Sequence, residues 1–469
     1  MLSALSQRQA RAELMISLHV PFGFFPDPVG GTEVYVAELA AALARQGHPP
    51  IIAAPASNDA EYVHEGLPVH RFAVSDRIND LSALYGQSDE EAVRRVGEIL
   101  DRERPDVFHM HAFTRACSVG LVRAAKARRI PVVFTYHTPT VSCQRGTLLE
   151  FGERVCDGRV DVARCTGCTL QGLGVNAFAS RLLGQTPTGI GQLVEGARLQ
   201  GGAWTALRMS SLVEQRRQAV VELFSLADRI VALTPWVRDL LIANRVPSNK
   251  ILVSSHGISV TDCRTRRSAH TGSRIRIAHL GRLDPIKGTA LLIRALSAVP
   301  DAAIDLDIFG IVQSENEVSV RTELLRLAAA DRRITLRDPI DHRTVIDRLA
   351  EYDLVAVPSQ WLETGPLVVL EAFAAGVPVL GSALGGLLDK VTEGVDGLLV
   401  RPYDSVDAWV AALRRLTENL DLLPRLAAGV RPPRSMNDVA TEMVNLYREL
   451  VPEPGYRAAA DAFTSTAIH

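Results

Sequence analysis

The sequence predicts an α/β protein with two doubly wound domains, each built on a parallel sheet covered by helices. Its length of 469 residues suits two to three domains. Short apolar runs of strand length recur in both halves, and several are followed by a glycine or proline turn and a helical pattern. This alternation of strand and helix patterns is typical of parallel sheets with crossover helices.

The N-terminal half begins with a buried strand expected over residues 14–20. A helix should follow Gly30 and Gly31, because apolar residues from Val36 to Leu43 recur at helical spacing. The two glycines let backbone approach a ligand closely at the helix start. A pair of glycines also fits an ordinary strand-to-helix turn.

Two further strands are expected over residues 105–111 and 131–137, and each opens with proline and ends in histidine. Ligands collect at the carboxyl ends of strands in doubly wound sheets, so strand-terminal histidines are candidates for a site. For His109, which lies on the strand itself, we expect a structural role with backbone hydrogen bonds. His137, at the end of its strand, is the functional candidate.

Residues 138–222 are the least regular region and contain four of the six cysteines, namely Cys143, Cys156, Cys165 and Cys168. A Cys-x2-Cys pair on a glycine-containing knuckle is a common half of a zinc site, and two more thiolates would complete four sulfur ligands. The alternative is a set of unrelated buried thiols, because spacings of 12, 8 and 2 intervening residues are looser than in a zinc ribbon. Disulfides are not expected in a reducing cytosol.

Residues 170–223 alternate glycine-rich turns with amphipathic pieces that carry arginines. Two interpretations stay open for this segment. It forms a helical lid packed on its own domain, or it lies on an anionic bilayer to reach a lipid-linked acceptor. Farther on, residues 261–273 lack apolar periodicity and mark a candidate domain boundary.

The C-terminal half has an apolar strand followed by two cations, Arg282 and Lys287, around a proline turn. Arginine can bind phosphate oxygens bidentately, and lysine adds a point charge. These residue types indicate a phosphate-binding loop, although a solvated turn would also accommodate them.

Glu363 and Glu371 lie eight positions apart, with Gly365 and Pro366 between them. Proline favours the start of a helix, which places Glu363 on a loop and Glu371 inside the helix. The free amides and positive dipole end of that helix suit a phosphate, while the two carboxylates can accept hydrogen bonds from sugar hydroxyls. A nucleotide sugar has this pattern of groups.

The segment from Glu363 to Glu371 resembles the E-x7-E motif of retaining glycosyltransferases of family 4, which have the GT-B fold. Residues 281–288 are similar to the family's G-R-L-x-x-x-K-G segment, and residues 382–400 to its paired-glycine loop with the turn and strand that follow. The G-G-x-E sequence at residues 30–33 is how family members commonly begin.

The sequence departs from the commonest family form at Gly365 and Pro366, where a Phe-Gly pair is usual. Proline has no amide hydrogen, so diphosphate contacts would have to come from the amides of Leu367 or Val368. By resemblance, the loop at residues 30–31 faces donor phosphate and acceptor.

The resemblance implies two Rossmann-like domains that face each other across a cleft, with the cysteine-containing insertion in the first. The expected divisions are an acceptor-side domain at residues 1–265 with an insertion at about 140–222, a nucleotide-sugar domain at 266–435, a closing helix at 436–452 that crosses back, and a tail at 453–469.

The resemblance also implies roles for the candidate residues. Arg282 and Lys287 would clamp the donor diphosphate, Glu371 would bind the ribose, and Glu363 and His137 would lie beside the donor sugar. The donor would be a nucleotide-diphosphate sugar, and the acceptor a hydroxyl of a sugar, a lipid-linked molecule or a small molecule, in polysaccharide, glycolipid or other glycoconjugate synthesis. The family uses no catalytic metal, so zinc on the cysteines would be structural.

Bulk composition narrows the function further. A net charge of −2 and an isoelectric point near 6.7 argue against a general nucleic-acid binder. Residues 1–13 contain no apolar run of signal length, so we expect a cytoplasmic enzyme, with peripheral contact at the inner membrane face left open. The alternatives are a sugar phosphorylase or nucleotide-sugar epimerase of the same fold, and a non-catalytic scaffold that uses the cysteine-rich insertion.

Overall fold

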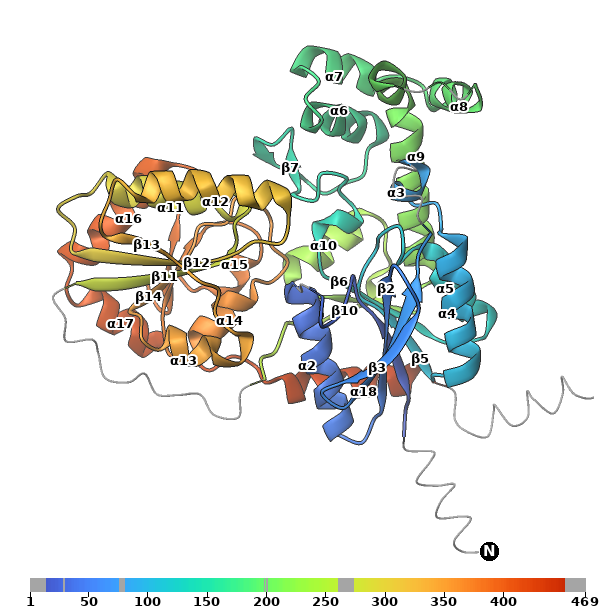
Figure 1. The fold of residues 1–469 in the computed structure, drawn as a ribbon, viewed down its shortest axis with the longest axis horizontal. Coiled ribbons are helices and arrows are strands. Elements are labelled where there is room, and N and C mark those ends of the chain that lie inside the picture. Colours follow the sequence, from blue (N-terminus) through green and yellow to red (C-terminus); the bar gives the residue numbers. More distant parts are fainter. Residues whose placement is uncertain are drawn as a thin grey trace, which may run out of the picture. The chain divides into compact units, whose positions relative to one another are not determined.

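The computed structural model describes residues 14–27, 30–75, 81–197, 199, 201–259 and 274–451. The chain divides into two compact units (Figure 1). The first comprises Met1–Leu233, Val237–Ser255 and Met436–His469, and the second Thr234–Trp236 and His256–Ser435. The candidate boundary at 261–273 and the expected tail at 453–469 lie outside the described residues.

The first unit is built on an eight-stranded sheet in the order β10-β9-β6-β5-β1-β2-β4-β3. Its strands are β1 (Ser17–Val20), β2 (Pro50–Ala56), β3 (Ala60–His64), β4 (Leu67–Ala73), β5 (Val107–Met110), β6 (Val132–Tyr136), β9 (Arg229–Ala232) and β10 (Ile251–Val253). All pairs are parallel except β3 with β4. The strands that follow β1 in sequence, β2 to β4, lie on one side of it, and the later strands β5, β6, β9 and β10 lie on the other side. The strand order therefore reverses between β1 and β5.

The central strands β1, β5 and β6 are buried at every position because helices cover both faces of the sheet. The main helices of this unit outside the insertion are α2 (Gly31–Arg45), α3 (Leu81–Leu84), α4 (Glu90–Glu103), α5 (Val119–Ala127), α10 (Pro235–Ala243) and α18 (Met436–Leu450). The closing helix α18 packs against α2, where Val439 and Met443 share one apolar core with Val36 and Leu43.

The cysteine-bearing insertion forms a separate helical layer of the first unit (Figure 1). It contains the hairpin β7 (Leu149–Glu150) and β8 (Arg154–Val155) and the helices α6 (Val162–Gly172), α7 (Ala177–Gly184), α8 (Thr188–Gly196) and α9 (Gly202–Leu226). The long helix α9 packs on α5 and also contacts α6, α7 and α8. Figure 1 shows these three helices at the outer end of α9, away from the sheet.

The glycine between Cys165 and Cys168 has a different role from the one predicted. Both cysteines lie inside α6, so the expected knuckle is wrong. A Cβ at Gly167 would lie 3.0 Å from the Ser180 carbonyl oxygen, and one at Gly184 would lie 2.6 Å from the Ala163 carbonyl oxygen. These glycines let α6 and α7 approach backbone to backbone, a packing reason that a four-residue motif does not reveal.

The second unit has a six-stranded parallel sheet in the order β13-β12-β11-β14-β15-β16. Its strands are β11 (Ile275–Arg282), β12 (Ile304–Ile311), β13 (Ile334–Arg337), β14 (Leu354–Val357), β15 (Val379–Ser382) and β16 (Gly397–Val400). Its helices are α11 (Thr289–Ser297), α12 (Glu315–Ala328), α13 (Val345–Leu349), α14 (Leu367–Ala374), α15 (Gly386–Lys390), α16 (Val406–Glu418) and α17 (Leu422–Gly429). The strand order reverses between β11 and β14.

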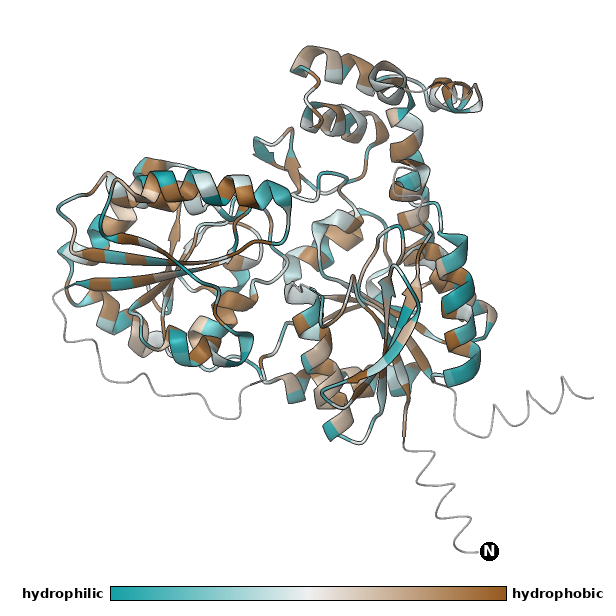
Figure 2. Ribbon diagram, viewed as in Figure 1, coloured by the Kyte–Doolittle hydropathy of each residue, from teal (hydrophilic) through white to brown (hydrophobic). Residues whose placement is uncertain are grey.

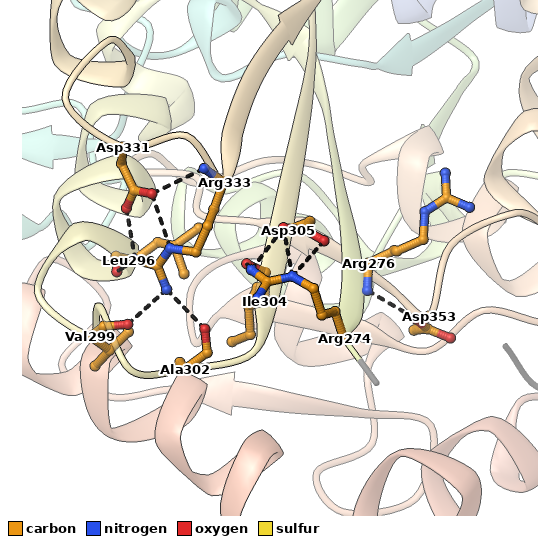
Figure 3. A network of polar contacts seen from close by, with 10 residues as sticks. All are labelled: Arg274, Arg276, Leu296, Val299, Ala302, Ile304, Asp305, Asp331, Arg333 and Asp353. Carbon is orange, nitrogen blue, oxygen red and sulfur yellow. Dashed lines mark hydrogen bonds and ion pairs between the residues drawn. The ribbon is translucent and has the colours of Figure 1, made fainter. Parts of the chain in front are cut away.

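Hydrogen bonds and ion pairs of arginine side chains connect segments at the amino-terminal edge of the second sheet (Figure 3). Arg333 donates to the carbonyl oxygens of Leu296, Val299 and Ala302 at 2.7 to 3.0 Å, which caps the end of α11. Asp331 holds the same guanidinium at 2.7 Å. These contacts lie at the edge opposite the carboxyl ends of the strands, where doubly wound sheets bind their ligands.

Figure 2 shows that α7 and α8 of the insertion also carry hydrophobic residues. Among the described helices, none is both long and apolar enough to cross a bilayer.

Candidate active site

The predicted residues of the second unit meet at the carboxyl edge of its sheet. Arg282 ends β11, Lys287 ends the 3-10 turn η3 (Pro285–Lys287), and Glu363 lies on the loop between β14 and α14. Since β11 and β14 flank the reversal in strand order, these side chains lie at the position where doubly wound sheets bind ligands. The predicted placement of Glu363 on a loop and Glu371 in a helix is confirmed.

Lys287 and Glu363 form the central contact of this edge. The lysine Nζ donates to Glu363 Oε1 at 2.7 Å and lies 5.4 Å from the centroid of the Trp361 ring. The Trp361 indole N–H, at 3.2 Å, and the Ser359 hydroxyl donate to the same oxygen. Burial raises the pKa of Glu363, but the charge and hydrogen bond of Lys287, with the other donors, outweigh it and leave the pKa below its usual range.

Three glycines hold the two loops of this contact in place. A Cβ at Gly288, whose φ is 71°, would lie 1.9 Å from the Pro358 carbonyl oxygen, so the two loops touch through their backbones. A Cβ at Gly385 would lie 3.0 Å from the Glu363 amide nitrogen, and the Gly386 amide donates to the Glu363 carbonyl at 2.7 Å. The paired-glycine loop therefore positions the backbone that carries the carboxylate.

Arg282 contacts a carboxylate that the sequence did not single out. One guanidinium nitrogen lies 3.3 Å from Glu317 Oε1, and another lies 3.9 Å from Asp284 Oδ2. Glu317 is in the first turn of α12, where its amide is 3.4 Å from the Ser314 hydroxyl. This Ser-x-x-Glu pattern is typical of an ordinary helix start, which is why it gave no functional signal.

Helix α14 begins after Pro366, with Leu367 and Val368 in its first turn. The preceding Gly365 has a packing role, because a Cβ there would lie 2.6 Å from the His256 ring. In the second turn, Glu371 Oε1 lies 3.8 Å from His342 Nδ1. The helix thus presents first-turn amides and one carboxylate, as predicted, and His342 is an added neighbour.

The first unit gathers four histidines at the carboxyl edge of its sheet: His19 in β1, His109 in β5, His111 after β5 and His137 after β6. All four are buried. His137 Nε2 lies 3.0 Å from His111 Nδ1, and burial lowers the pKa of His137 to about 3. The imidazole is therefore neutral over the physiological range.

The expectation of backbone partners for His109 is wrong. Its Nδ1 lies 2.6 Å from the Tyr447 hydroxyl and its Nε2 lies 2.7 Å from the Thr135 hydroxyl. Both partners are buried side chains, one of them on α18.

Gly30 caps the start of α2, and its amide donates to a Glu33 carboxylate oxygen at 2.8 Å. Gly31 follows as the first residue of the helix and is exposed. The predicted strand-to-helix turn is confirmed, while its contact with a ligand stays a prediction.

The four candidate cysteines of the insertion line one cavity of about 30 Å³. Two lie three positions apart on α6, and burial raises the pKa of Cys165 to about 12. Within the described ranges, the metal-ligating groups whose atoms all lie within 4.8 Å of one another are the histidines at 19, 109 and 111. The thiols share a cavity without this close spacing, and the predicted zinc site stays a prediction.

Two family models of glycosyltransferases match most of this chain. Residues 30–257 match the family model described as Glycosyl transferase 4-like domain, and residues 264–430 match Glycosyl transferases group 1. The D-inositol 3-phosphate glycosyltransferase of Xylanimonas cellulosilytica is 27% identical over 441 residues, which cover 90% of this chain and 92% of the relative.

Solved structures show the same fold at low identity. The Anabaena protein Alr3699/HepE in complex with UDP and glucose aligns with a TM-score of 0.61 at 15% identity, covering 92% of this chain and 99% of that one. Sucrose-phosphate synthase from Thermosynechococcus elongatus aligns with a TM-score of 0.62 at 19% identity, covering 93% and 99%.

Proposed function

The chain belongs to the family 4 glycosyltransferases and has their GT-B fold, and on this premise we propose how its residues bind and transfer a sugar. The predicted fold class and enzyme class are confirmed, and the reaction is transfer of a sugar from a nucleotide-sugar donor. The observation that carries the residue assignment is the 2.7 Å pair of Lys287 and Glu363 at the strand reversal.

We assign the donor diphosphate to Arg282, Lys287 and the amides of Leu367 and Val368. Lys287 uses one N–H on Glu363, and an ammonium has three, so two remain for phosphate oxygens. The guanidinium of Arg282 likewise has more donors than its contacts with carboxylates use. The start of α14 adds its amides and the positive end of its dipole.

In this proposal, two carboxylates bind the two sugar rings of the donor. Glu371, on the second turn of α14, accepts from ribose hydroxyls. All three donors around Glu363 meet Oε1, so we propose Oε2 as the acceptor for a hydroxyl of the transferred sugar. His137 acts on the same sugar, and the backbone at Gly30 and Gly31 contacts donor phosphate and acceptor.

The chemistry follows from where charge develops. As the glycosidic bond breaks, negative charge grows on the leaving diphosphate, and Arg282 and Lys287 are preorganised cations that stabilise it. We propose transfer with retention of configuration through front-face attack, in which the leaving phosphate accepts the proton of the acceptor hydroxyl.

Ligand-induced thermal stabilisation tests the donor assignment directly. Uridine diphosphate sugars are the first candidates, because the similar Anabaena structure holds UDP and glucose. A ligand at 100 times its Kd adds about 2.7 kcal/mol to the free energy of unfolding. No stabilisation by any nucleoside diphosphate or its sugars would overturn the assignment.

Acceptor identity needs a separate assay. Inositol phosphate is the first acceptor to test, because the Xylanimonas relative is a D-inositol 3-phosphate glycosyltransferase. The same assay separates the alternatives: a phosphorylase would form product with inorganic phosphate, and an epimerase would convert the nucleotide sugar without an acceptor. Transfer that depends on a hydroxyl acceptor supports the transferase.

We propose a structural zinc held by the four cysteines of the insertion. They line one cavity, and two of them lie three positions apart on α6. Burial disfavours the thiolate of Cys165, and a bound divalent cation would reverse this preference. Zinc there would fix α6 to the loops around the hairpin β7–β8 and take no part in the transfer.

We also propose that α7 and α8 contact a membrane surface. Phe178 is 81% exposed, Leu182 65% and Leu193 75%. Arg181, which is exposed, is the one charged residue of α7, and Glu195 near the end of α8 pairs with Arg208 at 2.9 Å. An apolar helical face with a cation suits the interface of an anionic bilayer.

A further inference from the structure

Glu317 is a buried acid in a surface segment of the second unit. Residues 311–319, which contain the end of β12 and the start of α12, are exposed at every position except this one. Glu317 is 4% exposed, whereas Val318 beside it is 54% exposed. A glutamate is seldom buried unless its charge is paired, and hydrophobic packing would have buried the valine instead. The burial of Glu317 therefore indicates an electrostatic role.

The two carboxylate oxygens of Glu317 have different partners. Oε2 accepts a hydrogen bond from the backbone amide of Gln313, which precedes the helix. Oε1 accepts from Arg282 Nη1 at 3.3 Å. Because the amide holds the carboxylate against the backbone, the oxygen that faces Arg282 has a fixed position.

Asp284 is built in the same way. Its Oδ1 accepts from the Ile286 amide at 3.0 Å, and its Oδ2 lies 3.9 Å from Arg282 Nη2. Each terminal nitrogen of the Arg282 guanidinium thus has a backbone-anchored carboxylate beside it. Since the guanidinium is a planar, rigid group, two anchored neighbours restrict its orientation as well as its position.

We propose that Glu317 is a positioning residue that holds Arg282 in the orientation in which it meets the donor diphosphate, with Asp284 as a second, weaker support. The inference rests on the proposed role of Arg282 in binding that diphosphate. The Arg282 side chain is 38% exposed, and without an anchor it would lose rotamer freedom each time it bound a ligand. A cation that is already ordered needs no such reorganisation as the glycosidic bond breaks.

An ordinary helix cap is one competing explanation, because Ser314 and Glu317 have the spacing of a capping box. The Ser314 hydroxyl accepts from the Glu317 amide at 3.4 Å, and Glu317 Oε2 accepts from Gln313. These contacts explain one carboxylate oxygen and leave the contact of Oε1 with Arg282 unexplained. Ser314→Ala weakens the cap without removing a charge, so it is a matched control for the structural part of the effect.

Competition with the ligand is the other explanation. A carboxylate beside the clamp repels a diphosphate, so Glu317 could withhold Arg282 instead of presenting it. Removal of the carboxylate would then tighten binding of the nucleoside diphosphate and leave kcat unchanged. Positioning predicts a different result, namely a lower kcat, because Arg282 would be misplaced when charge develops on the leaving group.

The test is a double-mutant cycle between Glu317 and Arg282 in the full-length protein, with turnover measured on the best donor among UDP-, GDP- and ADP-sugars. Glu317→Ala should lower kcat by about 10- to 100-fold, as expected when a reacting group is misplaced. Glu317→Gln, which keeps the shape and one oxygen acceptor, should lower it less. In an Arg282→Ala background neither change should lower kcat further, since Glu317 acts through Arg282. Glu315→Gln is the control for charge, because Glu315 is an exposed acid in the same helical turn.

Thermal unfolding checks the ion pair without a ligand. Glu317→Gln should raise the unfolding midpoint of Arg282→Ala, which leaves a buried carboxylate without its cation, and should not raise that of the unsubstituted protein. The same direction of shift in both backgrounds would show that the two side chains are not coupled.

Three kinetic results would overturn the positioning role. These are effects of Glu317→Ala and Arg282→Ala that multiply in the double variant, a loss of kcat no larger than that of Ser314→Ala, and tighter binding of UDP, GDP or ADP with an unchanged kcat. The two levels of the proposal fail separately. Normal turnover of Arg282→Ala would reject the diphosphate clamp, whereas low turnover of Arg282→Ala with normal turnover of Glu317→Ala would reject only the role of Glu317.

Discussion

Lys287 and Glu363 lie 76 positions apart in the sequence and form an ion pair of 2.7 Å at the carboxyl edge of the second sheet. The carboxylate side chain is 8% exposed and that of the lysine 20%. One cation thus keeps a buried carboxylate ionised and retains donors for a phosphate. The pair couples the loop after β11 to the loop after β14, where the strand order reverses.

Lys287→Met should destabilise the protein by about 3 kcal/mol at pH 7, because it leaves the buried Glu363 without its counter-charge. In the unsubstituted protein the pKa of Glu363 lies below its usual value. The ionised Glu363 therefore stabilises the protein above a pH of about 4.3, and this stabilisation is lost as the pH falls below that value. In the variant that pKa should be raised, so the deficit should grow as the pH increases from 4 to 7. Denaturant unfolding at several pH values measures this.

Removing both charges provides the control for this pair. Lys287→Met combined with Glu363→Gln should recover most of the lost free energy of unfolding, since no unpaired charge stays buried. A single variant that is as stable as the double variant at every pH would show that the pair has no electrostatic role.

Arg282→Ala should lower turnover by roughly 10²-fold in a folded protein, because one preorganised cation is lost from the leaving diphosphate. The matched control is Arg294→Ala, since Arg294 is an exposed arginine on the neighbouring helix α11. Steady-state kinetics with the best donor measures both. Near-normal turnover of Arg282→Ala would reject the clamp.

Glu371→Ala should weaken binding of the nucleoside diphosphate by about 1.5 to 3 kcal/mol, the loss of a charged hydrogen bond to ribose. Glu363→Ala should leave this affinity nearly intact and impair sugar transfer only. Isothermal titration with the nucleoside diphosphate separates the two carboxylates. Equal affinity in both variants would show that Glu371 does not bind ribose.

Local patterns predicted these candidate residues because the features that place them are local. Pro366 marks the start of α14, which is enough to put Glu363 on a loop and Glu371 in a helix. Likewise, the apolar run before Arg282 predicted a strand whose carboxyl end carries the two cations.

The partners of these residues were missed because they come from remote segments. Glu317 meets Arg282 because Arg282 is paired with Ile311 at the end of β12 and α12 follows that strand, while the sequence around Glu317 shows an ordinary helix start. His19 and His111 are 92 positions apart and meet because β1 and β5 are paired in register. The sequence predicted a turn at Gly167, whereas the structure shows that this glycine allows close contact with α7, a segment that the local motif does not include.

Protein purified without added metal should contain about one zinc per chain, the stoichiometry of one closed four-ligand site. Cys165→Ser with Cys168→Ser should abolish it and make residues 140–220 more sensitive to protease, because the metal supplies local folding free energy. Cys117→Ala is the control, since this buried cysteine donates to the Pro21 carbonyl instead. A metal-free protein with four titratable thiols at these positions would reject the site.

Phe178→Ser combined with Leu193→Ser should weaken binding to vesicles of anionic phospholipid by 10-fold or more. Each large apolar side chain contributes about 1.5 to 3 kcal/mol when it is fully buried, and 1.4 kcal/mol corresponds to a factor of ten. Leu420→Ser is the matched control, because Leu420 is 85% exposed but lies in the second unit. Arg181→Gln should reduce binding at low salt more than at high salt, since only its contribution is screened by ions. Cosedimentation with the vesicles measures all three variants, and equal binding by Phe178→Ser with Leu193→Ser and by Leu420→Ser would remove α7 and α8 as the membrane surface.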